Sequence, residues 1–319
     1  MHRNNSEEFG VAVDYSRSEE HQYLDLMNHV LSYGCTKPNR TGVPTKSVFG
    51  NTMKFTLSRV HDSEIKLIVP LLTTKKIVYR LIVEELLWFV SGSTDAKVLE
   101  AKKVKIWTPN SSREFLDKVG LGHLREGDIG AGYGFQLCHF GAKYINCDTD
   151  YTGQGINQLD SIKQSLTNDP YSRRHIISLW NPTDLKNTAL APCHILCQFN
   201  VDPVNDSDPS GQKYLDCSVY QRSADIPLGV PFNIASYATL THIIAKTVGM
   251  IPRNLIYSTG DTHIYSNQIE NCYEQISRTP MDFPLLEIDK KEEFGDYKWK
   301  DFKLIGYNHH PEIKYPFSA

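Results

Sequence analysis

Residues 194–201 read HILCQFNV and residues 214–220 read YLDCSVY, and these two runs decide the fold. Every second residue of the first run is apolar and would face one side of a sheet: Ile195, Cys197, Phe199 and Val201. The second run alternates in the same way. Residues 202–213 between them are rich in Asp, Pro, Ser, Asn and Gly, which is typical of a loop. The pattern therefore predicts two neighbouring strands joined as a long hairpin.

Three helical segments accompany this hairpin. Apolar residues recur at helical spacing in His21–Ser32, Ile77–Val90 and Phe232–Val248, and a glycine follows each segment within two residues. Ile77–Val90 is apolar on most sides, so we expect it to be deeply buried. His175–Trp180 is predicted to be a further short strand. The mixture predicts an α+β fold, a single domain in which helices flank a large mixed β-sheet.

The composition limits the classes of protein to which the chain can belong. Of its 319 residues, 40% are hydrophobic and 22% charged, so a large core is available. The formal net charge of −3 provides no basic field for DNA, and no apolar run approaches the roughly 18 residues of a membrane span. Residues 1–20 are polar and lack a signal-peptide core. We therefore expect a disordered tail over 1–20 and one domain over 21–319.

The seven cysteines are odd in number and scattered, and none forms a CxxC motif or a zinc-binding spacing. A disulfide framework is not expected in a chain of this length. We therefore expect free thiols, no metal, and a reducing compartment. The expected location is the cytoplasm, or the nucleus if the source is eukaryotic or viral.

Glu85 is an acidic residue in an apolar part of the second predicted helix. Its neighbours three and four positions away are all apolar: Leu81, Ile82, Trp88 and Phe89. Glu84 has Arg80 four residues earlier as an expected partner, whereas Glu85 has no local partner. Burial raises the pKa of a lone carboxyl group towards the range that suits proton transfer. Glu85 is therefore either a catalytic acid or base, or a structural carboxylate paired with a distant side chain.

Cys193 and His194 stand at the start of the predicted strand. Neighbouring strand residues point to opposite faces, so His194 is not expected to be the base for Cys193. A single cysteine is more often a packed thiol than a nucleophile, and both interpretations stay open on this pattern alone. Four arginines lie beside predicted strands or turns, where they would form either an anion site or ordinary surface charge: Arg40, Arg173, Arg174 and Arg222.

A series of long motifs runs through the chain in a fixed order. They are Asn39–Gly42, Pro70–Lys75, Glu84–Phe89, Ser172–Arg174, Trp180–Pro182, Ala191–His194, Gln221–Asp225, Leu228–Tyr237, Gly260–Tyr265, Gly306–Asn308 and Ile313–Lys314. Together they resemble the thymidylate synthase family over residues 21–319. The resemblance implies reductive methylation of dUMP to dTMP, with 5,10-methylenetetrahydrofolate as the carbon and hydride donor. It also implies a homodimer that packs sheet to sheet.

The resemblance implies a role for each matching residue. Cys193 would add to carbon 6 of the uracil ring and Glu85 would organise the proton relay, within a catalytic set of Cys193, Glu85, Asp225, His194, Tyr133 and Asn233. The residues implied to bind dUMP are Arg40, Gln221, Arg222, Ser223, Asp225, Asn233, His263 and Tyr265, joined by Arg173 and Arg174 of the partner subunit. The residues implied to bind folate are Trp107, Asn110, Asp225, Leu228, Gly229, Phe232, Lys314 and Ala319.

Some positions depart from the family pattern. Thr108 replaces an acidic residue after Trp107, and Leu137-Cys138 replaces a Trp-Arg pair; both changes bear on the folate contacts. One alternative function is a dUMP hydroxymethylase of the same fold, in which water replaces hydride. Asn233 favours uracil, because relatives that act on dCMP carry Asp there, and Trp107 favours hydride. The other alternative is a non-catalytic nucleotide- or RNA-binding homologue, which would not need Cys193.

Overall fold

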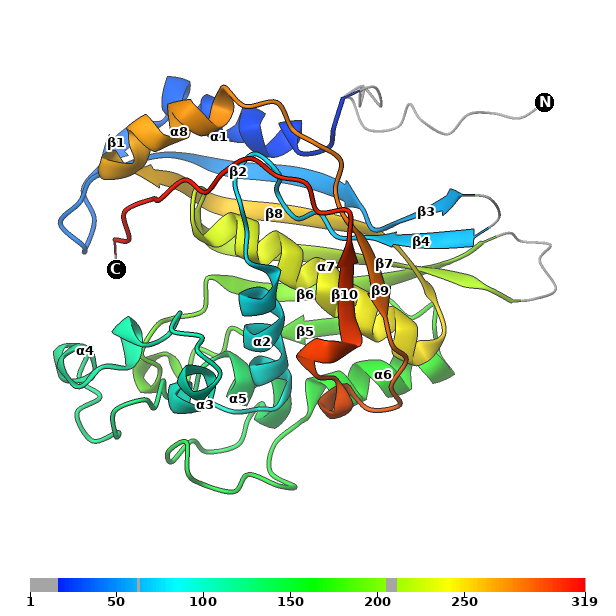
Figure 1. The fold of residues 1–319 in the computed structure, drawn as a ribbon. Coiled ribbons are helices and arrows are strands. Elements are labelled where there is room, and N and C mark those ends of the chain that lie inside the picture. Colours follow the sequence, from blue (N-terminus) through cyan, green and yellow to red (C-terminus); the bar gives the residue numbers. More distant parts are fainter. Residues whose placement is uncertain (1–16, 62–63, 205–210, 319) are drawn as a thin grey trace.

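A six-stranded sheet forms the centre of the molecule in a computed structural model that describes residues 17–61, 64–204 and 211–318 (Figure 1). The strand order is β1 (Cys35–Lys37), β2 (Thr45–Thr56), β8 (Ile251–Tyr265), β7 (Lys213–Asp225), β6 (His194–Pro203) and β5 (Ile176–Ser178). All neighbours are antiparallel except β7 and β8, which run parallel, so the sheet is mixed as predicted. The predicted hairpin is confirmed as β6 and β7; residues 205–210 of its loop lie outside the described part.

A second sheet was not predicted. It contains four antiparallel strands in the order β10 (Phe302–Ile305), β9 (Leu285–Ile288), β4 (Glu64–Ile68) and β3 (Ser58–His61). Each of these strands is only four or five residues long, which leaves too few positions for a reliable alternation of apolar and polar residues.

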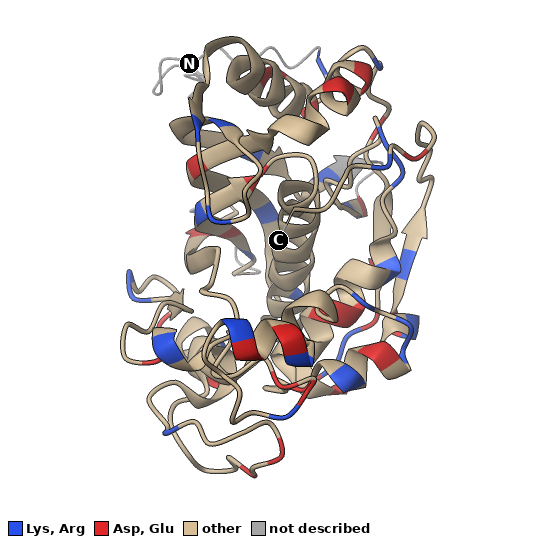
Figure 2. Cartoon of the chain, turned by 90° about the vertical axis from the view of Figure 1, so that its left-hand side faces the viewer, with Lys and Arg blue, Asp and Glu red and all other residues tan. Residues whose placement is uncertain are grey.

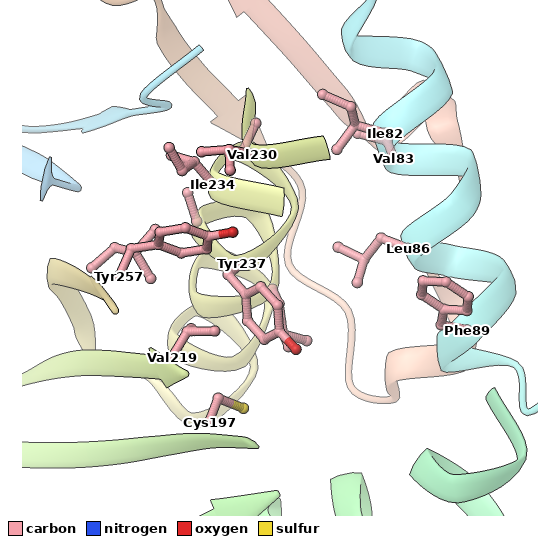
Figure 3. Packing of buried hydrophobic residues seen from close by; sticks show 14 of the residues in the cluster. Ile82, Val83, Leu86, Phe89, Cys197, Val219, Val230, Ile234, Tyr237 and Tyr257 are labelled. Atoms are coloured by element: carbon pink, nitrogen blue, oxygen red, sulfur yellow. The ribbon is translucent and has the colours of Figure 1, made fainter. Parts of the chain in front are cut away.

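Helix α7 (Gly229–Val248) crosses one face of the large sheet and is buried on almost every side (Figure 1). Helix α2 (Tyr79–Val90) lies beside it, and Figure 3 shows Leu86 of α2 pointing towards α7. Both predicted helices are confirmed with shifted starts. α7 begins three residues earlier than expected, so that Pro231 lies in its first turn. Backbone N–H groups in the first turn have no partner within the helix, so a proline, which lacks an N–H, costs no hydrogen bond there. α7 ends at Gly249, whose φ of +74° is left-handed.

Helix α1 (His21–Tyr33) packs against β2 and confirms the first predicted helix. The remaining α-helices are α3 (Ala96–Ala101), α4 (Arg113–Lys118), α5 (Tyr133–His139), α6 (Gln158–Asn168) and α8 (Ile269–Ile276). Of these, α8 lies next to α1, and α6 packs against α7 and β5. Among the described residues, no helix combines the length and apolar character needed to cross a membrane.

Residues from the N-terminal and C-terminal parts of the described chain meet at residues 73–74. Glu20 is fully buried, and its carboxylate accepts four hydrogen bonds, from the N–H and hydroxyl groups of Thr73 and Thr74. His310 N donates to the Thr73 carbonyl at 2.8 Å, and Arg278 donates to the Thr74 carbonyl at 2.7 Å. Residues 1–16 of the expected tail lie outside the described part, but the buried Glu20 shows that ordered structure begins before His21.

Candidate active site

The topology brings the ends of four strands to one edge of the large sheet. β7 and β8 run parallel and therefore end together, with Asp225 opposite His263. β6 starts at this edge, where His194 lies opposite Gln221, and β2 starts there with Thr45 opposite Tyr265. The segments that carry Cys193, Arg222 and the Arg40 turn are therefore neighbours, although they are far apart in the chain.

The backbone around Cys193 is held on both sides. Its N–H donates to the Tyr133 hydroxyl at 2.7 Å, and its carbonyl accepts from Arg222 N at 2.8 Å. The Arg222 guanidinium donates to the Pro192 carbonyl at 2.7 Å and to the Ala191 carbonyl at 2.9 Å, and stacks on the Trp180 ring. Burial raises the pKa of the Cys193 thiol, whereas the charges of Arg222 and Arg40 and the Tyr133 hydroxyl lower it. The surroundings therefore supply positive potential to a fixed thiol.

His194 is a half-buried, neutral ring. Burial lowers its pKa to about 3. Its Nδ1 is 2.8 Å from the Tyr237 hydroxyl, and the ring stacks on Tyr133 at a centroid distance of 4.3 Å. These contacts agree with the expectation that His194 is not the base for Cys193. They support the position of Tyr133, whose hydroxyl contacts the Cys193 backbone.

Glu85 has a partner that lies 22 residues further along the chain. Its carboxylate accepts from the Trp107 indole N–H at 2.7 Å and is 8% exposed. Burial raises the pKa of Glu85 to about 7, although the bond from Trp107 acts in the opposite direction. The expected pairing of the neighbouring Glu84 with Arg80 is wrong: Glu84 pairs with Lys102 at 2.7 Å. Arg80 donates instead to the Lys102 carbonyl.

An aromatic cluster connects Glu85 to the region of Cys193. The Trp107 ring meets the Tyr133 ring edge-on at 5.8 Å, and the Phe89 ring lies 4.9 Å from Tyr133. These rings are buried, so they exclude water from the space between the carboxylate and the thiol loop. A low-dielectric environment of this kind strengthens the effect of each nearby charge.

The four arginines fall into two groups. Arg40 is exposed on the turn before β2, where Asn39 Oδ1 accepts from Thr41 N at 2.8 Å, and it acts on Cys193 together with Arg222. Arg173 and Arg174 lie on the turn before β5. The Arg173 carbonyl accepts a hydrogen bond from Gln198 Nε2 on β6. Gln198 lies five residues after Cys193, which corresponds to roughly 16 Å along the strand. Within one chain, the structure does not bring this second pair to the thiol.

The residues expected to bind the pyrimidine and sugar lie near the same edge. Among the described residues, the side-chain amide of Asn233, the fifth residue of α7, has no hydrogen-bond partner, and it is half-buried. His263 Nδ1 is 3.1 Å from Asp261 Oδ1, and its ring meets Tyr265 edge-on. Gln221 is fully buried and donates to the Ser223 carbonyl, so it shapes the end of β7.

The residues expected on the folate side combine a carboxyl group with apolar surface. Burial raises the pKa of Asp225, against the opposing charges of His263 and Lys75, and its carboxylate accepts from Leu228 N at 3.3 Å. Leu228 and Phe232 are half-buried and pack against the core. Three more residues expected on the folate side are described: Gly229 starts α7, Asn110 is buried, and Lys314 is exposed. The backbone N–H of Asn110 donates to the Trp107 carbonyl. Ala319 lies outside the described residues.

Lys75 and Tyr237 are site neighbours that the sequence analysis missed. Lys75 is buried, donates to the Pro227 carbonyl and lies 4.7 Å from the centre of the Tyr315 ring; burial lowers its pKa to about 8. Its presence in the Pro70–Lys75 motif was a signal for a role. Tyr237, the partner of His194, lies in the Leu228–Tyr237 motif.

The departures from the family pattern also have structural partners. The Thr108 hydroxyl donates to Glu100 Oε1 at 2.8 Å, which connects the turn after Trp107 to α3. Cys138 is buried, and its thiol contacts the Val90 carbonyl at the end of α2. Both departures are therefore accommodated within packed parts of the chain.

Comparison with known proteins identifies the family. The family model described as thymidylate synthase matches residues 21–319. The chain is 49% identical to a thymidylate synthase of Candida albicans, over 94% of this chain and 98% of that protein. It is 48% identical to the human thymidylate synthase, over 92% of this chain and 89% of that protein. It is also 49% identical to a bifunctional dihydrofolate reductase-thymidylate synthase of Paramecium tetraurelia, over 93% of this chain, and the match spans only 60% of that protein. The chain belongs to the thymidylate synthase family.

Proposed function

We propose that Cys193 is the nucleophile with which this methyltransferase converts dUMP to dTMP. The observation that carries this proposal is the environment of the thiol. Tyr133 and Arg222 fix its backbone, and the positive charges of Arg222 and Arg40 oppose the effect of burial on its pKa. The thiolate forms a bond to carbon 6 of the uracil ring, and the electron pair of the 5,6 double bond makes carbon 5 nucleophilic.

Glu85 holds and releases protons beside the pyrimidine. Its pKa of about 7 means that both the neutral and ionised forms are populated near neutral pH, as general acid–base catalysis requires. The indole N–H of Trp107 holds one carboxylate oxygen of Glu85, and the other oxygen is left for the proton relay. His194 stays neutral, and with Tyr237 it holds Tyr133 in place.

The phosphate of dUMP is bound by Arg40, Arg222 and Ser223, and by Arg173 and Arg174 of the partner subunit. The separation of roughly 16 Å along β6 supports a role for Arg173 and Arg174 in another subunit rather than their own. The homodimer forms through the sheet face opposite α7. Apolar side chains that are partly exposed on this face support that contact, including Ile176 at 42% and Tyr220 at 38%. On the side of the molecule in Figure 2, Lys and Arg are interspersed with Asp and Glu, which gives DNA no uniform basic surface.

The chemistry of the folate-side residues fits the cosubstrate 5,10-methylenetetrahydrofolate. The half-buried carboxyl group of Asp225 suits an amino-pyrimidinone edge, and the half-buried Leu228 and Phe232 suit a flat apolar ring. When bound, the folate supplies the one-carbon unit and the hydride. Trp107, Asn110, Gly229 and Lys314 complete this side of the site, with Ala319 as a further proposed contact. The comparisons favour this reaction over a hydroxymethylase or a non-catalytic homologue.

We propose that the protein lies in the cytoplasm, or in the nucleus if the source is eukaryotic or viral. All seven cysteines are free, which supports a reducing compartment.

A covalent adduct tests the proposed nucleophile. The chain is incubated with 5-fluoro-dUMP and methylenetetrahydrofolate, digested, and the modified peptide identified by mass spectrometry. The adduct should lie on Cys193, and Cys193→Ser should still bind dUMP but lose both adduct and turnover, because a serine hydroxyl is too weakly ionised. Cys197, four residues along and buried, is the internal control. An adduct on Cys197, or turnover by Cys193→Ser, would overturn the assignment.

A further inference from the structure

Arg173 and Arg174 are exposed on a turn whose backbone is held firmly in place. In the described part of the chain, neither guanidinium has a hydrogen-bond or ion-pair partner, so both are available to an anion outside their own subunit. The next residue, His175, has the opposite character because it is completely buried. A polar ring, rather than an apolar side chain, thus occupies this buried position.

The His175 ring connects the turn to a helix. Nε2 donates to the Pro170 carbonyl at 3.0 Å, because a carbonyl oxygen can only accept. Nδ1 shares a hydrogen bond of 3.0 Å with the Ser165 hydroxyl on α6. An apolar side chain of the same size would fill the space, but it would leave the Pro170 carbonyl without this partner. The ring therefore fixes both ends of the turn that contains the two arginines.

Strand β6 holds the other side of the same turn. Phe199 N donates to the His175 carbonyl at 2.9 Å, and Gln198 Nε2 donates to the Arg173 carbonyl at 3.2 Å. The backbone of the turn is thus fixed against both α6 and β6, while the two arginine side chains extend into solvent. A backbone that is already ordered loses less conformational entropy when the guanidinium groups bind an anion.

We infer that His175 is a positioning residue for the phosphate of dUMP and that it acts in trans. It holds Arg173 and Arg174 in the orientation in which they serve the active site of the other subunit. This inference rests on the proposed sharing of arginines across the dimer. A histidine with a merely structural role would affect stability but not the affinity for dUMP.

The homodimeric variants provide the first test. His175→Ala should raise the KM for dUMP about tenfold with little change in kcat, since weakening the placement of charged hydrogen bonds costs about one order of magnitude in affinity. Ser165→Ala removes only one of the two ring contacts, keeps the fold, and should raise the KM in the same direction by less. His242→Gln is the matched control, because His242 is equally buried in α7 but bonds the Ile68 carbonyl, which is not part of the arginine turn. It should lower thermal stability and leave the KM unchanged. An unchanged KM in both His175→Ala and Ser165→Ala would overturn the inference.

A heterodimer provides the test of action in trans. One subunit carries His175→Ala and the other Cys193→Ala, with two different affinity tags so that only heterodimers are purified. The sole intact thiol then lies in the His175→Ala subunit and receives arginines from a subunit with an intact turn, so the KM for dUMP should return to the wild-type value. A KM that stays raised means that His175 acts within its own subunit, and the inference is wrong.

A second heterodimer separates this outcome from failure of the proposed dimer. It combines the double variant Arg173→Ala, Arg174→Ala with Cys193→Ala. If this heterodimer is active and the His175→Ala heterodimer keeps a raised KM, only the role of His175 is overturned. If neither recovers, the shared site itself is wrong and the inference fails with it.

Discussion

The indole N–H of Trp107 donates to the carboxylate of Glu85 at 2.7 Å inside an aromatic cluster. Two opposing effects set the pKa of this carboxyl group: burial raises it, and the hydrogen bond lowers it, with a result of about 7. Trp107 therefore adjusts the acid–base midpoint of Glu85, in addition to its proposed contact with the folate.

Replacing Trp107 should shift the pH dependence of catalysis. Trp107→Phe removes the donor that stabilises the ionised carboxylate, so the limb of the kcat profile that Glu85 governs should move to higher pH by roughly one unit, the equivalent of one hydrogen bond. Glu85→Gln should remove that limb and lower kcat at least about 100-fold. Trp88→Phe is the matched control, because the Trp88 indole donates to the Asp95 carbonyl instead. A limb at the same pH in wild type and Trp107→Phe would contradict this role.

Mixed dimers should regain activity if the site is shared. The double variant Arg173→Ala, Arg174→Ala and the variant Cys193→Ala should each be nearly inactive as homodimers. After unfolding and refolding of an equal mixture, about a quarter of wild-type activity should return, because half of the dimers are mixed and each has one complete site. The measurement is dTMP formation per total protein. Refolded wild type is the control for recovery, and a mixture no more active than its components would exclude sharing.

Asn233 should influence the choice of pyrimidine. Its amide can accept from the ring N–H of uracil and donate to the adjacent carbonyl, a pattern that cytosine inverts. No described residue fixes the orientation of this amide, so discrimination by Asn233 alone should be at the lower end of about 1–3 kcal/mol per unpaired group. Asn233→Asp should lower dUMP turnover at least about tenfold and permit turnover of dCMP. The measurement is the turnover of dUMP and of dCMP by wild type and by Asn233→Asp. If the variant keeps the wild-type preference for dUMP, another residue selects the pyrimidine.

Because of Lys75, the free energy of unfolding should change with pH in the alkaline range. Its folded pKa of about 8 lies below the ordinary value of 10.5, so between these values the unfolded chain binds more protons and stability rises with pH. Below pH 8 the lysine is charged in both states, and its buried charge destabilises the fold. The difference in the free energy of unfolding, wild type minus Lys75→Met, should therefore increase by up to about 3 kcal/mol between pH 7.5 and pH 10. Urea unfolding of both proteins at both pH values measures this difference. If it is the same at pH 7.5 and pH 10, the lowered pKa of Lys75 is refuted.

Periodicity predicted the parts of the fold in which one face of a long element is buried. The hairpin of β6 and β7 and the helices α2 and α7 extend over ten or more residues, so their patterns were readable. The four-stranded sheet was missed because its strands are too short for a pattern. The ends of helices depended on local chemistry, as at Pro231, which the first turn of α7 accommodates.

The candidate site could be predicted in its residue types but not in its pairings. The apolar neighbours of Glu85 indicated burial, and the raised pKa agrees with that interpretation. Its partner Trp107 could not be predicted, because a contact across 22 residues depends on how α2 packs against the segment after α3. The contacts of Arg222 with the carbonyls of residues 191 and 192 likewise depend on how β7 and β6 meet.

The junction at Thr73 and Thr74 has a consequence for the order of events during synthesis. Glu20, which is translated early, can bind both threonines early, but the Thr74 carbonyl waits for Arg278 and the Thr73 carbonyl for His310. Early domains and segments generally fold as they emerge from the ribosome. The hydrogen bonds at this corner cannot all form so early, because the last two come from Arg278 and His310, which are translated more than 200 positions after Thr73. In the nascent chain, the carbonyls of Thr73 and Thr74 therefore lack these donors until Arg278 and His310 have been translated.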